Sequence, residues 1–271
     1  MELNLFEELV LAELLEDAYL RRFAGIARLY GVKGLSNLHG ANVCVVGVGG
    51  VGSWVAEALA RSGIGRVGLI DLDDVCISNT NRQLPALEGQ FGRMKVAAVA
   101  ERLRAINPDI ELRLIEDFVA EDNFGDYLIG YDYVIDCIDS VKTKAAMIAF
   151  CRRHKVKIIT VGGAGGQIDP TQIKVDDLSK TIQDPLAAKV RNILRRDFGF
   201  AKNGKKMGVE CVYSTEQLVY PQADGSVCAA KPQAGEGVRL DCASGFGAVM
   251  TVTATFGLVA VSRVLKYLAF K

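Results

Sequence analysis

The stretch 42–71 constrains the fold of this chain more than any other part of the sequence. An apolar, β-branched run over 43–46 predicts a buried strand, and a helical pattern follows over 53–62. Between them stand glycines at G-x-G-x-x-G spacing with one extra glycine: Gly47, Gly49, Gly50 and Gly52. A second strand over 67–70 ends on Asp71, where a carboxylate can hold ribose hydroxyls while the glycines admit a phosphate. The stretch predicts a nucleotide site, without deciding among NAD, FAD and ATP.

The alternation of strands and helices continues after this stretch. Strand candidates occur at 111–115, 133–136 and 157–161, and helix candidates at 95–106 and 142–154. Such alternation is typical of right-handed βαβ units, in which ligands bind at the carboxyl ends of the strands. We therefore predict an α/β fold with a Rossmann-like, doubly wound, mostly parallel sheet.

The pattern changes after Gly166. A basic helical stretch over 181–196 and short strand candidates near 209–220 indicate a smaller, partly antiparallel C-terminal region. Since no internal repeat or long linker separates the parts, we expect one domain over 1–271. It would comprise a helical lead-in at 1–40, a nucleotide-binding core at 41–166 and the C-terminal region at 167–271.

The overall charge limits the classes of partner. Lysine plus arginine and aspartate plus glutamate number 32 each among 271 residues, so the net charge is zero. This argues against a protein that is basic all over, although a local basic patch can still bind nucleic acid. The seven cysteines form no C-x-x-C pair, which argues against a zinc site. Because no secretion signal is evident, we expect a cytoplasmic protein with reduced cysteines.

The stretch 243–262 carries no charge and is long enough to cross a membrane. Its glycines, threonines and serines make it only mildly hydrophobic. We expect a helix that is buried in the core or in a subunit contact, and membrane association is the less favoured alternative.

Several charged residues could meet one nucleotide. Arg82 and Lys95 supply positive charge for phosphates, and Asp139 is a hard oxygen ligand for Mg²⁺. ATP chemistry needs this combination, because cations must neutralise the charge that develops on phosphate oxygens. Hydride transfer does not need it, so a nicotinamide oxidoreductase is disfavoured. A non-catalytic nucleotide-binding adaptor is a further rival.

Four motifs carry a resemblance to a known family. They are Asp71-x-Asp73, then Asn79-Thr80-Asn81-Arg82-Gln83, then Gly92-Arg93-Met94-Lys95, and last Asp136-Cys137-Ile138-Asp139. In the order D-x-D, N-x-x-R-Q, G-x-x-K and D-x-x-D, they resemble the ATP-adenylating ThiF/MoeB-like and ubiquitin-activating proteins. The paired C-x-x-C zinc motifs of the sulfur-carrier activators are absent.

The resemblance implies roles for particular residues. Asp71 would hold the ribose, Asn79 and Arg82 would contact the triphosphate, Lys95 would steady the phosphates and Asp139 would hold Mg²⁺. The glycines, Asp73 and Gln83 complete the expected nucleotide site. The family also supplies an arginine from a second subunit of a homodimer, in an R-Y-x-R-Q segment near the N-terminus. Here that segment reads Arg22-Phe23-Ala24-Gly25-Ile26, so Arg22 is the best substitute, with Arg21 or Arg28 as alternatives.

Further segments resemble one branch of this family, which acts on threonylcarbamoyladenosine next to the anticodon of tRNA. The segments are 28–31, 162–171, 180–186 and 241–247. The branch implies ATP-dependent dehydration: the substrate carboxylate becomes an acyl-adenylate, a ring closes, and AMP and pyrophosphate are released. The alternative is adenylation of the C-terminal carboxylate of a small sulfur-carrier or ubiquitin-like protein. Cys242 could accept sulfur in that case, although a structural cysteine is favoured.

Two basic stretches are candidates for contact with tRNA. Residues 140–168 carry Lys142, Lys144, Arg152, Arg153, Lys155 and Lys157 without an acid between 140 and 168. For this stretch, a solvated helix face is an equally good reading. Residues 189–206 form a basic helix that leads into a glycine-containing loop, and here we favour RNA contact. The candidates are Arg195, Arg196, Lys205 and Lys206.

Overall fold

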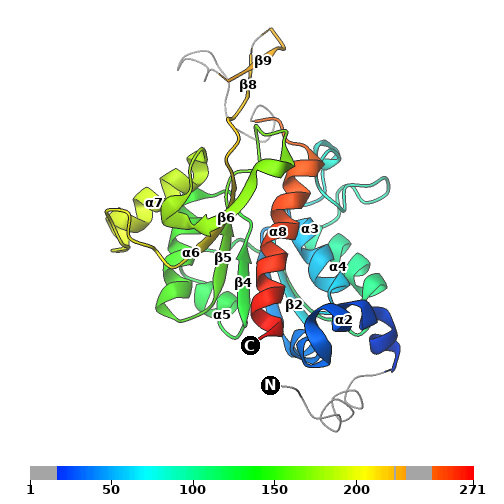
Figure 1. Cartoon of the computed structure of the whole chain (residues 1–271). Coiled ribbons are helices and arrows are strands. Elements are labelled where there is room, and N and C mark those ends of the chain that lie inside the picture. Colours follow the sequence, from blue (N-terminus) through cyan, green and yellow to red (C-terminus); the bar gives the residue numbers. More distant parts are fainter. Residues whose placement is uncertain (1–16, 223, 230–245) are drawn as a thin grey trace.

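A computed structural model describes residues 17–222, 224–229 and 246–271. Its main feature is a seven-stranded sheet in the order β3-β2-β1-β4-β5-β7-β6, in which only β6 runs antiparallel (Figure 1). The strands are β1 (Asn42–Val46), β2 (Arg66–Ile70), β3 (Glu111–Ile115), β4 (Tyr133–Asp136), β5 (Ile158–Val161), β6 (Ile173–Asp177) and β7 (Glu210–Ser214). The predicted α/β, mostly parallel, doubly wound sheet is confirmed.

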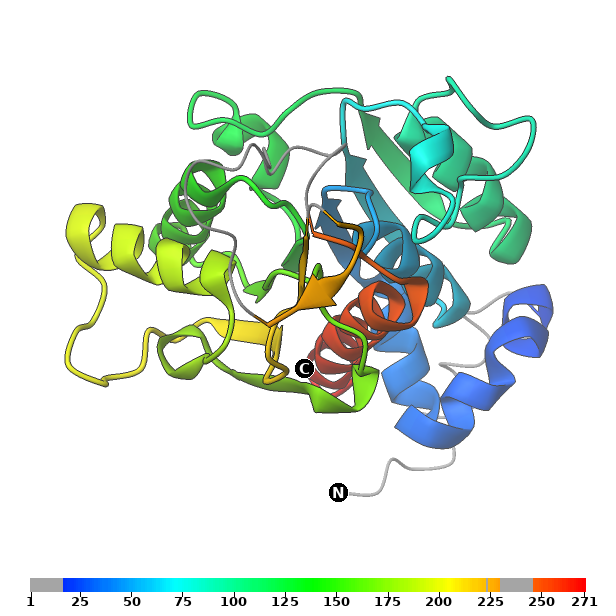
Figure 2. The same cartoon turned by 90° about the horizontal axis from the view of Figure 1, so that it is seen from above.

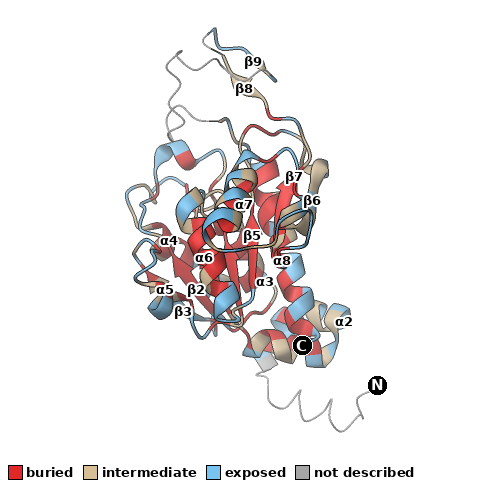
Figure 3. Ribbon diagram, turned by 90° about the vertical axis from the view of Figure 1, so that its left-hand side faces the viewer, coloured by how far each residue is buried: buried red, intermediate tan, exposed pale blue. Residues whose placement is uncertain are grey.

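Alternate residues of the central strands face two separate cores. On β1, Val43 and Val45 pack in one core, and Cys44 and Val46 pack in the other. The first core lies under α3 (Gly52–Arg61), α4 (Lys95–Ile106) and α8 (Met250–Ala269). The second lies under α5 (Phe124–Leu128), α6 (Val141–Arg153) and α7 (Pro185–Asp197). Because both faces are covered, the central strands are buried and mostly apolar, and Figure 3 shows this burial.

The uncharged C-terminal stretch contributes a core helix. Its residues 243–245 lie outside the described residues, and the helix α8 begins only at Met250. One face of α8 is fully buried, including Val252, Phe256 and Val264. It lies beside α3 (Figure 2), and Gly257 permits this approach because a Cβ there would come within 2.9 Å of the Val51 carbonyl oxygen. Among the described helices, α8 alone is long and apolar enough to cross a membrane, but most of it is buried within the protein. The expectation of a buried core helix is confirmed.

The lead-in helix α2 (Asp17–Gly40) packs on the same core. The helix is broken at Gly31, whose positive φ of 78° ends one helical segment before the next begins. After the break, Leu35 and Leu38 are fully buried, and the Asn37 amide donates to the Ala269 carbonyl at 3.0 Å. Before the break, Tyr19 and Phe23 form a small apolar cluster with Leu35. The rest of the expected lead-in, residues 1–16, lies outside the described residues.

The C-terminal region extends the same sheet. β7 pairs in parallel with β5 and antiparallel with β6, and β8 (Tyr220–Pro221) and β9 (Val227–Cys228) form a separate ribbon. The ribbon projects beyond the carboxyl end of the sheet (Figure 1). Helix α7 begins at Pro185 rather than near residue 181, because Asp184 caps it by accepting from the Ala187 amide and proline occupies the first turn. The described residues also form three short 3₁₀ turns: η1 (Ile77–Asn79), η2 (Pro170–Gln172) and η3 (Leu178–Lys180).

The strand order reverses between β1 and β4, and this places the ligand site. β2 and β3 lie on one side of β1, whereas β4 and β5 lie on the other. The loops after β1 and β4 therefore leave in opposite directions and open a crevice at their carboxyl ends. The glycine loop follows β1, and the loop carrying Asp139 follows β4.

Candidate active site

The glycine loop, residues 47–52, connects β1 to α3 and is so tightly packed that side chains do not fit at some of its positions. Gly47 has a φ of 85°, which disfavours any residue with a side chain. A Cβ at Gly52 would lie 1.8 Å from the Gly47 carbonyl oxygen, so the first turn of α3 presses directly on the loop. At Gly49, in contrast, the nearest atom to a Cβ would be the Gln83 Nε2 at 3.8 Å. Gly47 and Gly52 therefore determine the shape of the loop, whereas Gly49 leaves its outer surface open.

Three charged residues stand beside this loop. The Asp71 carboxylate accepts from the Val48 amide at 2.6 Å and from the Asp73 amide at 2.9 Å, so the glycine loop itself holds it. The Lys95 ammonium lies 2.7 Å from the Asp73 carboxylate and 3.9 Å from that of Asp71. Lys95 is almost fully buried at the first residue of α4. The structure thus brings together the predicted ribose ligand and one predicted phosphate ligand.

The loop after Asp73 brings Arg82 and Gln83 to the other side of the glycines. The Arg82 side chain is half-buried, and its stem passes within 3.3 Å of the position of a Cβ on Gly50. The Trp54 indole N–H from α3 donates to the Arg82 carbonyl at 3.0 Å and so fixes the backbone. The Gln83 side chain is 8% exposed, and its buried Oε1 atom has no hydrogen-bond partner among the described residues. An unpaired buried amide oxygen beside an open glycine loop can accept a hydrogen bond from a ligand.

Asn79 has a clear role in holding this loop. Its Oδ1 atom accepts from the Cys76 amide at 3.1 Å, which caps the short turn η1. The Asn81 amide next to it donates to the Ala248 carbonyl at 2.6 Å, just before α8. Contact of Asn79 with a triphosphate stays a prediction, because the side chain already supports the loop that presents Arg82.

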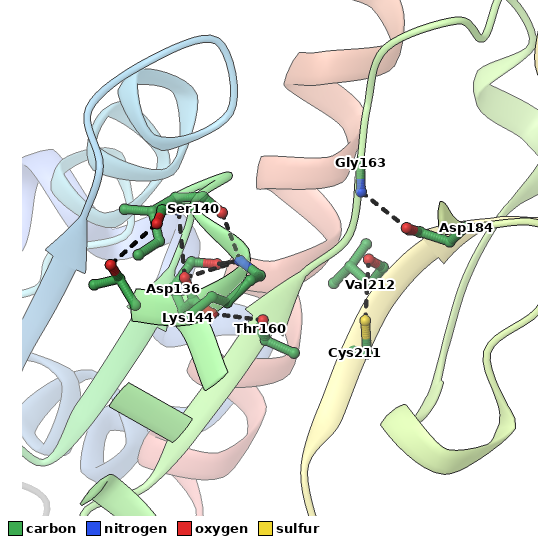
Figure 4. Close-up of polar contacts among 10 residues, drawn as sticks. Asp136, Ser140, Lys144, Thr160, Gly163, Asp184, Cys211 and Val212 are labelled. Carbon is green, nitrogen blue, oxygen red and sulfur yellow. Dashed lines mark hydrogen bonds and ion pairs between the residues drawn. The ribbon is translucent and has the colours of Figure 1, made fainter. Parts of the chain in front are cut away.

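The loop after β4 carries Asp139 and rests on a buried ion pair. The Lys144 ammonium from α6 lies 2.9 Å from the Asp136 carboxylate and donates to the Ile138 carbonyl at 2.7 Å (Figure 4). The Thr160 hydroxyl of β5 donates to the other Asp136 oxygen at 2.6 Å. Burial is the largest influence on the Asp136 carboxyl and raises its pKa, whereas Lys144 and Thr160 act in the opposite direction. Asp139 itself is exposed and makes no side-chain ion pair with the described residues.

This network corrects one sequence-based interpretation. Lys144, read as part of a basic surface stretch, is only 1% exposed and is paired with Asp136. The hypothesis of an RNA-binding face therefore loses this residue. The signal in the sequence was Asp136 itself, since an acid at the end of an otherwise apolar strand needs a buried partner.

A second glycine-rich loop, 162–166, follows β5 at the same edge of the sheet. The Gly163 amide donates to the Asp184 carboxylate at 3.0 Å (Figure 4). A Cβ at Gly162 would lie 1.8 Å from that carboxylate, so the pairing requires glycine. The Gln167 amide donates to the Gly163 carbonyl at 3.0 Å, and its buried Oε1 atom has no partner among the described residues. Asp184 also lines a hollow of about 290 Å³ with Arg191 and residues near β8.

Arg22 lies far from the nucleotide site of its own chain. Its guanidinium donates to the Ile106 carbonyl at 3.5 Å, at the last residue of α4, whereas Lys95 is the first. These ends of α4 are about 16 Å apart at the rise of an α-helix. In one chain Arg22 therefore cannot join the other predicted site residues.

The four predicted tRNA contacts lie at the opposite, amino end of the sheet. They occupy the end of α7 and the loop that leads into β7 at Glu210, which pairs with Ile159 near the start of β5. Arg195 donates to the Ala201 carbonyl at 3.4 Å, and Arg196 pairs with Asp197 at 2.6 Å. Lys205 and Lys206 are exposed. Their contact with tRNA stays a prediction.

The ligands available around Asp139 suit a magnesium ion that is held partly by water and phosphates. They do not suit a metal that is enclosed by protein side chains. The described residues contain no cluster of three or more His, Cys, Asp or Glu residues that could enclose a metal. Mg²⁺ usually keeps several waters and takes only one or two protein carboxylates together with substrate phosphates. A single unpaired carboxylate at the β1–β4 crevice meets that requirement.

Comparison with known proteins decides the family. The model of the ThiF family matches residues 19–271. The chain belongs to the ThiF family. The resemblance that the four motifs carried is thereby confirmed, and these motifs meet at one edge of this ThiF-family sheet.

Individual ThiF-family relatives match over very different lengths. The tRNA threonylcarbamoyladenosine dehydratase of Escherichia coli (strain K12) is 60% identical over 259 residues, which cover 95% of this chain and 97% of that protein. A crystal structure of the E. coli enzyme, TcdA, in complex with ATP superimposes with a TM-score of 0.83 at 56% identity, covering 93% and 96% of the two chains. The molybdopterin-synthase adenylyltransferase of Salmonella typhimurium (strain LT2) is 32% identical over 151 residues, which cover 55% of this chain and 61% of that protein.

Proposed function

We propose that this protein is an ATP-dependent tRNA threonylcarbamoyladenosine dehydratase. The observation that carries the proposal is the match to the E. coli enzyme over almost the whole of both chains. It is supported by an arrangement in which a ribose ligand and two cations surround an open glycine loop. The match to the carrier-activating adenylyltransferase covers little more than half of this chain, so adenylation of a carrier protein is the second candidate.

Each residue of the site binds a different part of ATP. Asp71, already fixed by the Val48 amide, accepts the ribose hydroxyls, and the open surface at Gly49 admits the phosphate chain. The Arg82 guanidinium moves from its contact with the Ser78 carbonyl at 3.0 Å to the phosphates. Lys95, held between two carboxylates, exchanges the Asp73 pairing for a phosphate oxygen. Asp139 would hold Mg²⁺, which neutralises the charge on the phosphate oxygens when bound.

The chemistry needs no nucleophile from the protein. The threonyl carboxylate of the substrate attacks the α-phosphorus of ATP, and pyrophosphate leaves with the electron pair of the broken P–O bond. The carbamoyl group then attacks the activated carbonyl, closes a ring and releases AMP. Two cysteines fit this route, because burial raises the pKa of the Cys137 and Cys211 thiols above the usual range. Cys76 differs, since it is exposed and its hydrogen bond from Ser78 lowers the pKa of its thiol. Cys242 lies outside the described residues.

Mass spectrometry of nucleosides tests the function directly. Incubation of the protein with ATP and tRNA that carries threonylcarbamoyladenosine should convert the nucleoside to a product lighter by one water. AMP and pyrophosphate should appear in equal amounts. Formation of AMP only when a carrier protein with a free C-terminal carboxylate is supplied would instead favour the second candidate.

Two alanine substitutions in the glycine loop should have different effects. Gly52→Ala forces a Cβ against the Gly47 carbonyl, so it should cost roughly 2 kcal/mol of unfolding free energy and about 5 °C in Tm. Gly49→Ala meets no atom closer than 3.8 Å, so Tm should be unchanged. ATP affinity, measured by calorimetry, should fall at least ~10-fold because the Cβ occupies the path of the phosphates. An equal loss of Tm in both variants would contradict this division of roles.

We place Arg22 in the nucleotide site of a partner subunit, which requires a two-fold homodimer. The distance of Arg22 from Lys95 within one chain supports this, as does its exposure. Arg22→Ala and Asp139→Ala should each be inactive as homodimers. When they are mixed and exchange subunits, each heterodimer has one site with both groups intact, so about a quarter of the parent activity should return.

The matched control for this mixing experiment is Arg28→Ala with Asp139→Ala. Arg28 is exposed on the same helix, so this pair reports whether a neighbouring arginine acts instead. Subunit exchange is verified by capture of a tagged subunit. Exchange without recovery in the Arg22 pair would show that Arg22 does not act in trans.

A further inference from the structure

A cavity of about 740 Å³ opens at the amino ends of β4, β5 and β7, at the edge of the sheet opposite the glycine loop. The end of α8 closes its other side, near the C-terminus in Figure 1. Six cations line it: Arg152, Lys155, Lys157, Arg263, Lys266 and Lys271. We call it the amino-edge cavity.

The positive charge of the amino-edge cavity is mostly uncompensated. Among the described residues that line it, Glu210 has the one carboxylate side chain, and it pairs with Arg263 at 2.5 Å. Lys271 pairs with Asp132 at 2.8 Å. The other four cations form no ion pair with a carboxylate in the part of the chain that the structure describes. Since the whole chain has zero net charge, such a concentration favours an anionic ligand.

Aromatic rings accompany these cations. Tyr267 is 37% and Phe270 is 67% exposed, and both line the cavity. The Lys157 ammonium lies 5.0 Å from the centre of the Tyr267 ring. Cations that track phosphates beside exposed aromatic faces that can stack on bases are the usual combination for RNA. A small carboxylate ligand would need neither the rings nor so many cations.

The positive surface continues beyond the cavity. Gly208 lines the amino-edge cavity and belongs to the loop that connects α7 to β7. That loop carries Lys202, Lys205 and Lys206, and all three are exposed. The cavity and the loop therefore form one extended basic footprint, as a polymer with repeated negative charges requires.

We propose that the amino-edge cavity binds the phosphate backbone of the RNA substrate, away from the nucleotide site. This inference rests on the proposed function. Lys157 and Gly162 flank β5, so the cavity and the carboxyl edge are separated by about 17 Å of extended strand. When the modified base of a folded tRNA enters the nucleotide site, at the carboxyl edge of the sheet, other phosphates of the same tRNA lie within about 17 Å of it.

Neutralisation of the cavity tests the inference. The triple variant Lys155→Gln, Lys157→Gln and Lys266→Gln removes three unpaired cations. Affinity for tRNA is measured by fluorescence anisotropy between 50 and 300 mM KCl. We expect Kd to rise at least ~10-fold at the lowest salt, and the slope of log Kd against log salt to fall by about 2, since each released phosphate contact contributes 0.7 to 0.9. ATP affinity without tRNA should be unchanged.

The control removes the same charge elsewhere in the footprint. Lys202→Gln, Lys205→Gln and Lys206→Gln alter only the exposed loop. A smaller loss of slope in this control supports the cavity as the principal RNA contact. An unchanged slope in the cavity variant overturns the inference, as does a cavity variant that loses affinity for inorganic tripolyphosphate but not for tRNA.

The assay of the parent protein separates this inference from the proposed function. If the parent dehydrates threonylcarbamoyladenosine in tRNA and the cavity variant binds tRNA normally, only the inference fails. If the parent neither binds tRNA with a salt-dependent Kd nor modifies it, both fail.

Discussion

Asp139→Ala should lower the rate of pyrophosphate release from ATP at least ~100-fold, with modified tRNA present and the fold intact. The Asp139 carboxylate lies at the β1–β4 crevice and has no side-chain partner among the described residues. Its loss therefore removes a charge that is available to a ligand, and it breaks no contact within the protein. Loss of one positioned charge in a transition state costs ~3 kcal/mol or more. Arg82→Ala should act similarly, because its guanidinium, beside the glycine loop, is the second positioned charge.

The control for this prediction is Asp109→Ala. Asp109 is equally exposed but lies in the turn between α4 and β3, at the amino edge of the sheet. It should keep full activity. Thermal unfolding of Asp139→Ala should match that of the parent. Pyrophosphate release by Asp139→Ala within a few-fold of the parent rate would remove Asp139 from the proposed metal site.

Lys144→Met should be the most destabilising of the substitutions considered. It leaves the Asp136 carboxylate fully buried without its cation, and breaking a buried ion pair in this way costs about 3–5 kcal/mol of unfolding free energy. It also releases the Ile138 carbonyl, which the ammonium holds at 2.7 Å, and so loosens the loop that presents Asp139. Activity should therefore fall together with stability.

The matched control is Lys142→Met, two residues earlier on the same helix. Lys142 is exposed, so its loss should change the unfolding free energy by less than about 0.5 kcal/mol. The double variant Asp136→Leu with Lys144→Met should recover most of the stability, because a buried pair can be replaced by apolar side chains. Its activity should remain low, since nothing replaces the hydrogen bond to Ile138. Recovery of both stability and activity would show that Lys144 does not position the loop.

The pH dependence of Lys144→Met should have a definite sign. Burial raises the pKa of Asp136, and the variant lacks the ammonium that opposes this effect. The folded variant then holds a proton that the unfolded chain releases near pH 4. Its stability should therefore be greatest at low pH and decline as the pH rises through the raised pKa. Urea unfolding at pH 5 and pH 8 should show a larger deficit, relative to the parent, at pH 8.

The sequence by itself determined the elements and the chemistry of the nucleotide site. β1, β2 and the glycines between them appear where the pattern predicted, because local periodicity and glycine geometry depend on neighbouring residues alone. The strand order could not be predicted, but the edge that binds ligands could, since the carboxyl ends of parallel strands share one edge. That reasoning correctly placed Asp71 and Asp139 at the same side of the sheet.

Only the tertiary structure decided which cations are buried and which share a surface. A lysine in the first turn of a helix usually faces water, and Lys144 turns inward only because α6 starts directly over the end of β4. The amino-edge cavity combines Lys157 with Lys266, which are far apart in sequence, because β7 joins the sheet beside β5 and α8 returns across it. Such groupings depend on strand order and long-range packing, which leave no local periodic signal in the chain.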